Sequence, residues 1–147
     1  MKTASAVFLR IIRGIDASPE NVYSLWTDFS LFDQWDGRHG SEAIEIQDEF
    51  HEGGTFRWEL VDPFGDSVVL SGEFLKISPE KLVHTWRWQN IPDWADHESL
   101  VTVEFGGDGI TTDLRLTHEG LPNGDSRDKH LRGWYRMLNK LDLLIAA

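Results

Sequence analysis

Two histidines, His84 and His118, could carry out acid–base chemistry, because of their residue type and their positions in alternating segments. Each alternates in phase with large apolar residues, namely Trp86, Trp88, Leu114 and Leu116. A neutral imidazole donates one hydrogen bond and accepts another, and its ordinary pKa of about 6.5 permits proton transfer near neutrality. The two histidines are therefore either polar groups that could anchor a ligand on a buried apolar face or core histidines that are hydrogen-bonded to the backbone.

Other kinds of chemical site lack the spacing that they need. The remaining histidines, His39, His51, His97 and His130, form no His-x-x-x-His pair, and the chain has no cysteine, so no metal site is predicted. No serine lies in the glycine-flanked turn that exposes a nucleophile in common hydrolases. The glycine-rich segments 53–54 and 106–109 are interpreted as turns and not as phosphate-binding loops. We therefore expect no cofactor.

The composition limits the partners. The 25 acidic residues outnumber the 14 basic ones, and the formal net charge of −11 repels nucleic acid and an anionic membrane surface. Arg10 interrupts the first apolar run before a signal peptide or membrane span could form, and the lack of cysteine suits a reducing compartment. We expect a cytoplasmic protein that binds no nucleic acid and does not insert into a membrane.

The elements that position the histidines begin with a strand and a helix. The alternating segment 7–12 predicts a strand, and Ser18, Pro19 and Glu20 supply the cap, the first helical residue and the first-turn acid of a helix. Aromatic residues at a spacing of three predict a second short helix within 28–35.

Six further segments alternate between polar and apolar residues and predict strands at 43–47, 55–61, 67–77, 82–89, 98–105 and 110–118. The short turns between them favour antiparallel pairing of consecutive strands. The alternation gives this meander one apolar face and one polar face. Gly72 inside a strand predicts a bulge or a bend that curves the sheet.

From residue 125 to about residue 145 the period changes to that of a helix. Its apolar stripe consists of Leu131, Trp134, Leu138, Leu141, Leu144 and Ile145. We expect this helix to cover the apolar face of the sheet within one domain, residues 1–147. Its other side carries Arg132, Arg136 and Lys140, which we interpret as a solvated face of an acidic protein.

If the apolar face is concave and the helix stands off from it, the two enclose a ligand cavity. The predicted lining is Phe56, Trp58, His84, Trp86, Trp88, Val101, Val103, Leu114, Leu116, His118, Trp134 and Leu138. The same side chains could instead fill an ordinary core, and both interpretations stay open. Trp94, in the loop 89–97, either belongs to a lid or partner contact or packs onto the edge of the sheet.

Several segments together resemble a known family. They are 52–58 (EGGTFRW), 71–74 (SGEF), 80–86 (EKLVHTW), 100–105 (LVTVEF) and 116–122 (LTHEGLP), followed by Gly133 and Trp134. In this order they resemble bacterial single-domain relatives of the C-terminal domain of the activator of heat-shock-protein-90 ATPase, in the START-like (SRPBCC) superfamily. The resemblance runs from about Val7 to Leu144.

The resemblance implies an α+β helix-grip fold of the birch-pollen-allergen-like kind: a seven-stranded curved antiparallel sheet, two short helices and a long C-terminal helix. It also implies a cavity between sheet and helix, in which family members bind lipids or other hydrophobic molecules or catalyse cyclisations and hydrolyses. The eukaryotic activator has an additional N-terminal domain for which this chain has no residues, so chaperone activation is not expected to carry over.

Three functional hypotheses follow. The leading one is binding of an apolar or amphipathic small molecule between tryptophan walls, Trp58, Trp86, Trp88 and Trp134, with His84 or His118 as anchor. The second is a cyclase or hydrolase that uses a cavity histidine as general base. The third is a chaperone-linked protein-interaction module that uses the surface around Trp35 and Trp94, and a homodimer or a protein partner stays open.

Overall fold

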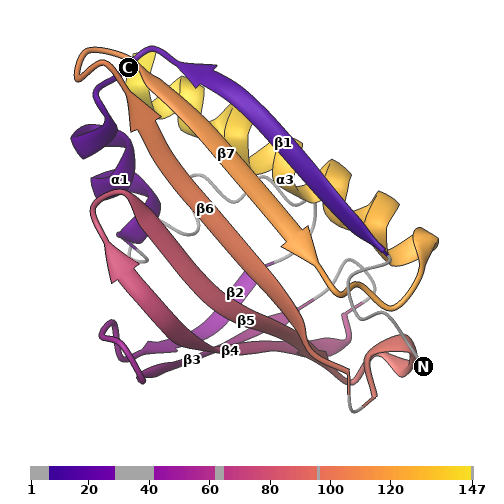
Figure 1. Cartoon of the computed structure of the whole chain (residues 1–147). Coiled ribbons are helices and arrows are strands. Elements are labelled where there is room, and N and C mark those ends of the chain that lie inside the picture. The colour runs from indigo at the N-terminus through magenta and orange to yellow at the C-terminus, as the bar shows by residue number, and fades with distance from the viewer. Residues whose placement is uncertain (1–6, 29–41, 62–64, 96, 147) are drawn as a thin grey trace.

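A curved seven-stranded antiparallel sheet packs against the long C-terminal helix α3 (Gly124–Ala146) in the computed structural model (Figure 1). The strand order is β1-β7-β6-β5-β4-β3-β2, so the first strand closes one edge beside the last. The structure describes residues 7–28, 42–61, 65–95 and 97–146. The strands are β1 (Phe8–Ile15), β2 (Glu42–Asp48), β3 (Thr55–Val61), β4 (Ser67–Ser78), β5 (Lys81–Gln89), β6 (Ser99–Gly107) and β7 (Thr112–Glu119).

The first helix, α1 (Pro19–Thr27), begins where the capping residues predict. The Ser18 side chain accepts a hydrogen bond from the Asn21 backbone N–H at 3.2 Å, and Pro19 occupies the first turn. Val22 and Trp26 are buried, which gives this helix the expected apolar face. The predicted second short helix falls mainly on residues 29–35, which lie outside the described residues.

The first and last strands differ from the predicted ones by two or three residues at one end and by one residue at the other. β1 continues to Ile15 because its backbone stays paired with β7 up to Thr112, and Arg13 on this added stretch pairs with Asp142 of α3 at 2.6 Å. β7 begins at Thr112 and not at residue 110, because Asp108 Oδ1 accepts the backbone N–H groups of Ile110 and Thr111 in a turn. Strand pairing thus sets the end of β1, and a side chain in the preceding turn sets the start of β7.

The core lies between α3, α1 and the middle of the sheet. The inward side chains of β6 and β7 are fully buried, as are Leu138 and Leu141 on the facing stripe of α3. With 23 residues, α3 is about 34 Å long, enough to cross several strands. In Figure 1, β2, β3 and β4 curve away from this helix while β1 and β7 lie alongside it.

Gly72 has a different role from the predicted bulge. The irregularity between β4 and β5 lies between Phe74 and Lys76, and Gly72 itself stands opposite Phe56 in regular pairing. A Cβ atom on Gly72 would lie 2.2 Å from the Thr85 carbonyl oxygen and 2.5 Å from the Phe56 ring. Glycine is therefore required here by close approach.

The substitution Gly72→Ala is expected to lower the free energy of unfolding by roughly 1–3 kcal/mol, because the backbone of Thr85 or the Phe56 ring must shift. Urea denaturation would measure the loss. Gly14→Ala in β1 is the matched control, since its Cβ would meet nothing within 4 Å. Equal losses in the two variants would contradict the packing argument.

Candidate ligand-binding site

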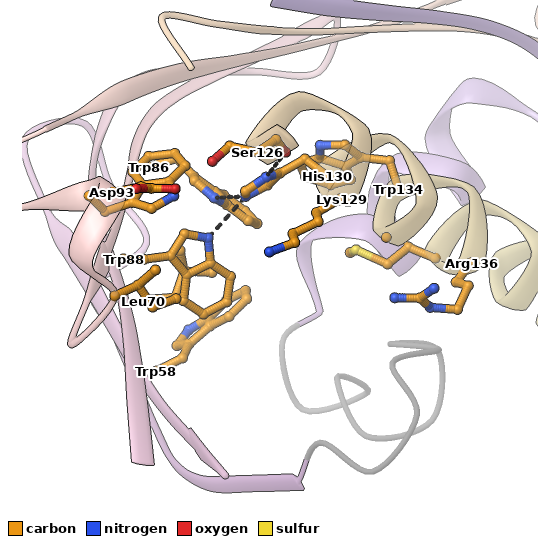
Figure 2. A pocket seen from close by; sticks show the side chains of 14 residues that line it. Trp58, Leu70, Trp86, Trp88, Asp93, Ser126, Lys129, His130, Trp134 and Arg136 are labelled. Carbon is orange, nitrogen blue, oxygen red and sulfur yellow. Dashed lines mark hydrogen bonds between the residues drawn. The ribbon is translucent and has the colours of Figure 1, made fainter. Parts of the chain in front are cut away.

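A pocket of about 290 Å³ lies between α3 and the strands β3, β4 and β5 (Figure 2). The short helix η2 (Pro92–Trp94) supplies its remaining edge. Most of its wall is aromatic or aliphatic, with a few polar groups. The lining residues are Trp58, Leu70, Trp86, Trp88, Ile91, Asp93, Trp94, Ser126, Lys129, His130, Gly133, Trp134, Arg136 and Met137.

His130 of α3 joins the helix to the sheet inside this pocket. The indole N–H groups of Trp86 and Trp88 both donate to His130 Nε2, at 3.2 Å and 2.9 Å. His130 Nδ1 lies 2.7 Å from the Ser126 carbonyl oxygen, one helical turn earlier. Two donors on Nε2 and an acceptor at Nδ1 fit the neutral Nδ1–H tautomer. Figure 2 shows these bonds converging on His130.

His118 of β7 lies beneath the pocket wall, fully buried. Ser99 Oγ donates to the Trp86 carbonyl oxygen, so His118 Nε2–H donates to Ser99 Oγ at 2.8 Å. Trp134 Nε1 donates to His118 Nδ1 at 3.2 Å, which completes the hydrogen bonds of a neutral ring. Burial lowers the pKa of His118 well below its ordinary value, and His130 and His84 add to the effect. His118 is a satisfied core histidine.

His84 of β5 is also part of the core. Its Nδ1 lies 2.9 Å from the Thr85 carbonyl oxygen, and its ring packs edge-on against Phe56 at 5.3 Å and Phe74 at 6.0 Å. Burial lowers the pKa of His84 to about 4, although the bond to Thr85 opposes the shift. The strand register places His84, Val101 and His118 in one row across β5, β6 and β7.

Large rings from sheet and helix meet at the base of the pocket. Trp134 stacks on Trp26 with ring centres 6.1 Å apart and lies 5.1 Å from the ring of Trp86. The rings of His118 and His130 meet edge-on at 5.0 Å. We call these five side chains the aromatic floor, because they close the space between α3 and the middle of the sheet.

The floor divides the residues predicted to contact a ligand into two groups. Trp58, Trp86, Trp88 and Trp134 line the pocket. The others do not line it and lie instead in the packed core: Phe56, His84, Val101, Val103, Leu114, Leu116, His118 and Leu138. They share the inward face of the sheet, where the rings of Trp86 and Trp134 pack together with centres 5.1 Å apart.

Several pocket residues were missed or assigned differently by the sequence patterns. Trp94 is 2% exposed and lies 5.4 Å from the ring of His130, so it packs inward, as one of the two predicted alternatives had it, and does not offer an exposed contact. Trp35, the other residue of the predicted interaction surface, lies outside the described residues. His130 precedes Trp134 by one helical turn, a spacing that could have placed it on the same face. Arg136 lines the pocket, contrary to the expected solvated face, and its Nε is buried.

Within the described ranges, no group of three or more His, Cys, Asp or Glu side chains is arranged to hold a metal ion. Among the helices described, none is both long and apolar enough to cross a membrane.

Comparison with known proteins identifies a family. The sequence profile described as "Activator of Hsp90 ATPase homolog 1-like protein" matches residues 16–146. No functionally curated protein matches the chain. Similar solved structures include protein CV1439 from Chromobacterium violaceum, 22% identical with a TM-score of 0.84 over 95% of this chain and 97% of that chain. The AHSA1 protein from Silicibacter pomeroyi is 25% identical, with a TM-score of 0.79 over 95% and 98%. CalU16 from Micromonospora echinospora is 24% identical, with a TM-score of 0.71 over 94% and 75%.

Proposed function

Because this chain belongs to the family of activator of Hsp90 ATPase homolog 1-like proteins and has their helix-grip fold, we propose that it binds an apolar or amphipathic small molecule between sheet and α3. The observation that carries the proposal is the pocket of about 290 Å³, walled by tryptophan rings from β3, β5, η2 and α3. Small-molecule sites typically have volumes of roughly 300–1,000 Å³ and a mainly apolar lining with a few polar groups. The pocket fits the small end of that range.

The polar groups of the pocket favour binding over catalysis. His130 is the histidine in its wall, and both ring nitrogens already make hydrogen bonds within the protein. A general base needs a lone pair within reach of the substrate, which an Nε2 facing two indole donors does not present. His84 and His118, the predicted anchors, lie in the core and not in the pocket wall.

A cavity-filling variant tests the proposal. Gly133 of α3 lines the pocket, and a Cβ added there would meet nothing within 4 Å. In Gly133→Leu the new side chain should occupy ligand space and weaken binding by roughly tenfold or more, as overpacking of 1–3 kcal/mol implies. The helix itself should gain about 0.5–1 kcal/mol from losing a glycine, so unfolding would not explain the lost binding.

Binding is measured by tryptophan fluorescence and calorimetry with a panel of fatty acids, lipids and aromatic metabolites. Gly124→Leu is the control, because Gly124 is exposed at the start of the same helix and outside the pocket. The proposal fails if no compound binds wild type at micromolar concentration, or if Gly133→Leu binds as tightly as wild type and Gly124→Leu.

A further inference from the structure

We propose that the ligand carries an anionic group, in the simplest case a carboxylate, and that Arg136 binds it while the apolar body lies against Trp58 and Trp88. The inference rests on the proposed function and adds the class of ligand and its orientation. Arg136 is a cation in the pocket wall, and its Nε makes no hydrogen bond with the described residues.

Arg136 lines the pocket from α3, and its Nε is buried without a hydrogen-bond partner among the described residues. A cation in a mainly apolar wall, without an acidic partner among the described residues, favours the arrival of an anion. A guanidinium also presents its donors as a planar fork that matches the two oxygens of a carboxylate.

Three basic side chains among the described residues have acidic partners close by. They are Arg13 with Asp142 at 2.6 Å, Lys129 with Asp125 at 3.2 Å and Arg127 with Asp128 at 3.3 Å. With 25 acidic and 14 basic residues, an acidic partner is easily supplied. Arg136 has no such partner in the part of the chain that the structure describes, and it is the arginine that lines the pocket.

The charges in the pocket wall set an orientation. Figure 2 shows Arg136 on the α3 side, across the pocket from Trp58 and Trp88, whereas Asp93 lies beside Trp86 at the other end. Asp93 accepts a hydrogen bond from Asn123 at 3.2 Å and repels an anion placed near it. An anionic head is therefore favoured at Arg136, and the apolar body is directed toward the tryptophans of β3 and β5.

Lys129 supports this polarity without serving as the anchor. Its Nζ pairs with Asp125, and the two side chains are 67% and 71% exposed, so solvent screens the charge. Lys129 adds positive potential along the same side of α3, whereas Arg136 offers the planar donor arrangement of a guanidinium.

The volume limits the size of the apolar body. A cavity of about 150 Å³ holds one benzene molecule, so about 290 Å³ accommodates roughly two rings or a medium-length alkyl chain. The ligand class that fits this volume is thus an aromatic or medium-chain carboxylate.

Calorimetric titration near neutral pH with two size-matched pairs tests the inference: decanoate against decanol, and naphthoate against naphthalenemethanol. The proteins are wild type, Arg136→Gln and Arg132→Gln, of which the last removes the same charge from an exposed position on the same helix. Arg136→Gln should weaken carboxylate binding about tenfold and leave alcohol binding unchanged, as the loss of one charge-assisted hydrogen bond implies. Arg132→Gln should behave as wild type.

Two outcomes overturn the inference in distinguishable ways. If the ratio of carboxylate to alcohol affinity is the same in wild type and Arg136→Gln, the pocket binds apolar molecules without the proposed anchor, and the proposed function stands. If no member of either pair binds wild type, the inference fails, and the proposed function is decided by the wider panel of fatty acids, lipids and aromatic metabolites. Thermal unfolding of each variant verifies that it is folded.

Discussion

Replacing Trp134 with alanine is expected to lower the free energy of unfolding by about 3–5 kcal/mol. Trp134 is 4% exposed, stacks on Trp26 and packs against Trp86, so its removal leaves a large cavity in the aromatic floor. It also donates a hydrogen bond to the buried His118, and that ring nitrogen would lose its partner. Since domains are typically stable by 5–15 kcal/mol, the variant should be close to unfolding at ambient temperature.

Chemical denaturation of two further variants separates the causes. Tyr135→Ala removes an aromatic side chain that is 45% exposed on the same helix, and it should cost well under the loss seen for Trp134→Ala. Trp134→Phe keeps a ring but removes the indole N–H, so it should show an intermediate loss of roughly 1–3 kcal/mol. If Trp134→Ala were no more destabilising than Tyr135→Ala, the aromatic floor would not be a main source of stability.

Stability is also expected to fall as the pH is lowered from about 6.5 to about 4. Burial lowers the pKa of His84 to about 4 and that of His118 well below its ordinary value, whereas both rings titrate near 6.5 in the unfolded chain. Between these values the unfolded state binds more protons than the folded state, so each added proton favours unfolding. For His84 alone the loss across the window is roughly 3 kcal/mol.

The variant His84→Phe isolates that contribution. Phenylalanine can keep the edge-on packing against Phe56 and Phe74 but does not titrate, so its unfolding free energy should vary less with pH than that of wild type. Urea denaturation at a series of pH values gives the slopes, and equal slopes in wild type and His84→Phe would rule out the buried imidazole as their source.

Much of the fold could be predicted because local patterns repeat over many residues. The alternation in 55–61 and 82–89 identifies strands and their buried face, and the cap at Ser18 sets the start of α1. The end of β1 and the start of β7 were less predictable, because the first depends on pairing with a strand far along the chain and the second on side-chain hydrogen bonds of Asp108 within a turn. Periodicity describes which residues share a face, and such bonds lie outside it.

The candidate site was predictable only in part. The phase of Trp58, Trp86, Trp88 and Trp134 placed these rings on the face where the pocket lies. The same phase also included Val101 and Leu116, which are fully buried in the core. The alternation of polar and apolar residues shows toward which side of the sheet a side chain points. It does not show whether that side chain meets a pocket or a packed core, because this depends on where rings from different elements meet.

The sequence by itself thus determined the elements, the apolar face and the tryptophan walls, because each follows from residue type at short, regular spacing. Only the tertiary structure decided that His130 is the pocket histidine, since its bonds to Trp86 and Trp88 join residues more than forty positions apart. It likewise decided that His118 is satisfied within the core and that Arg136 turns into the pocket. Packing of α3 across the curved sheet brings these groups together, and packing depends on the whole chain.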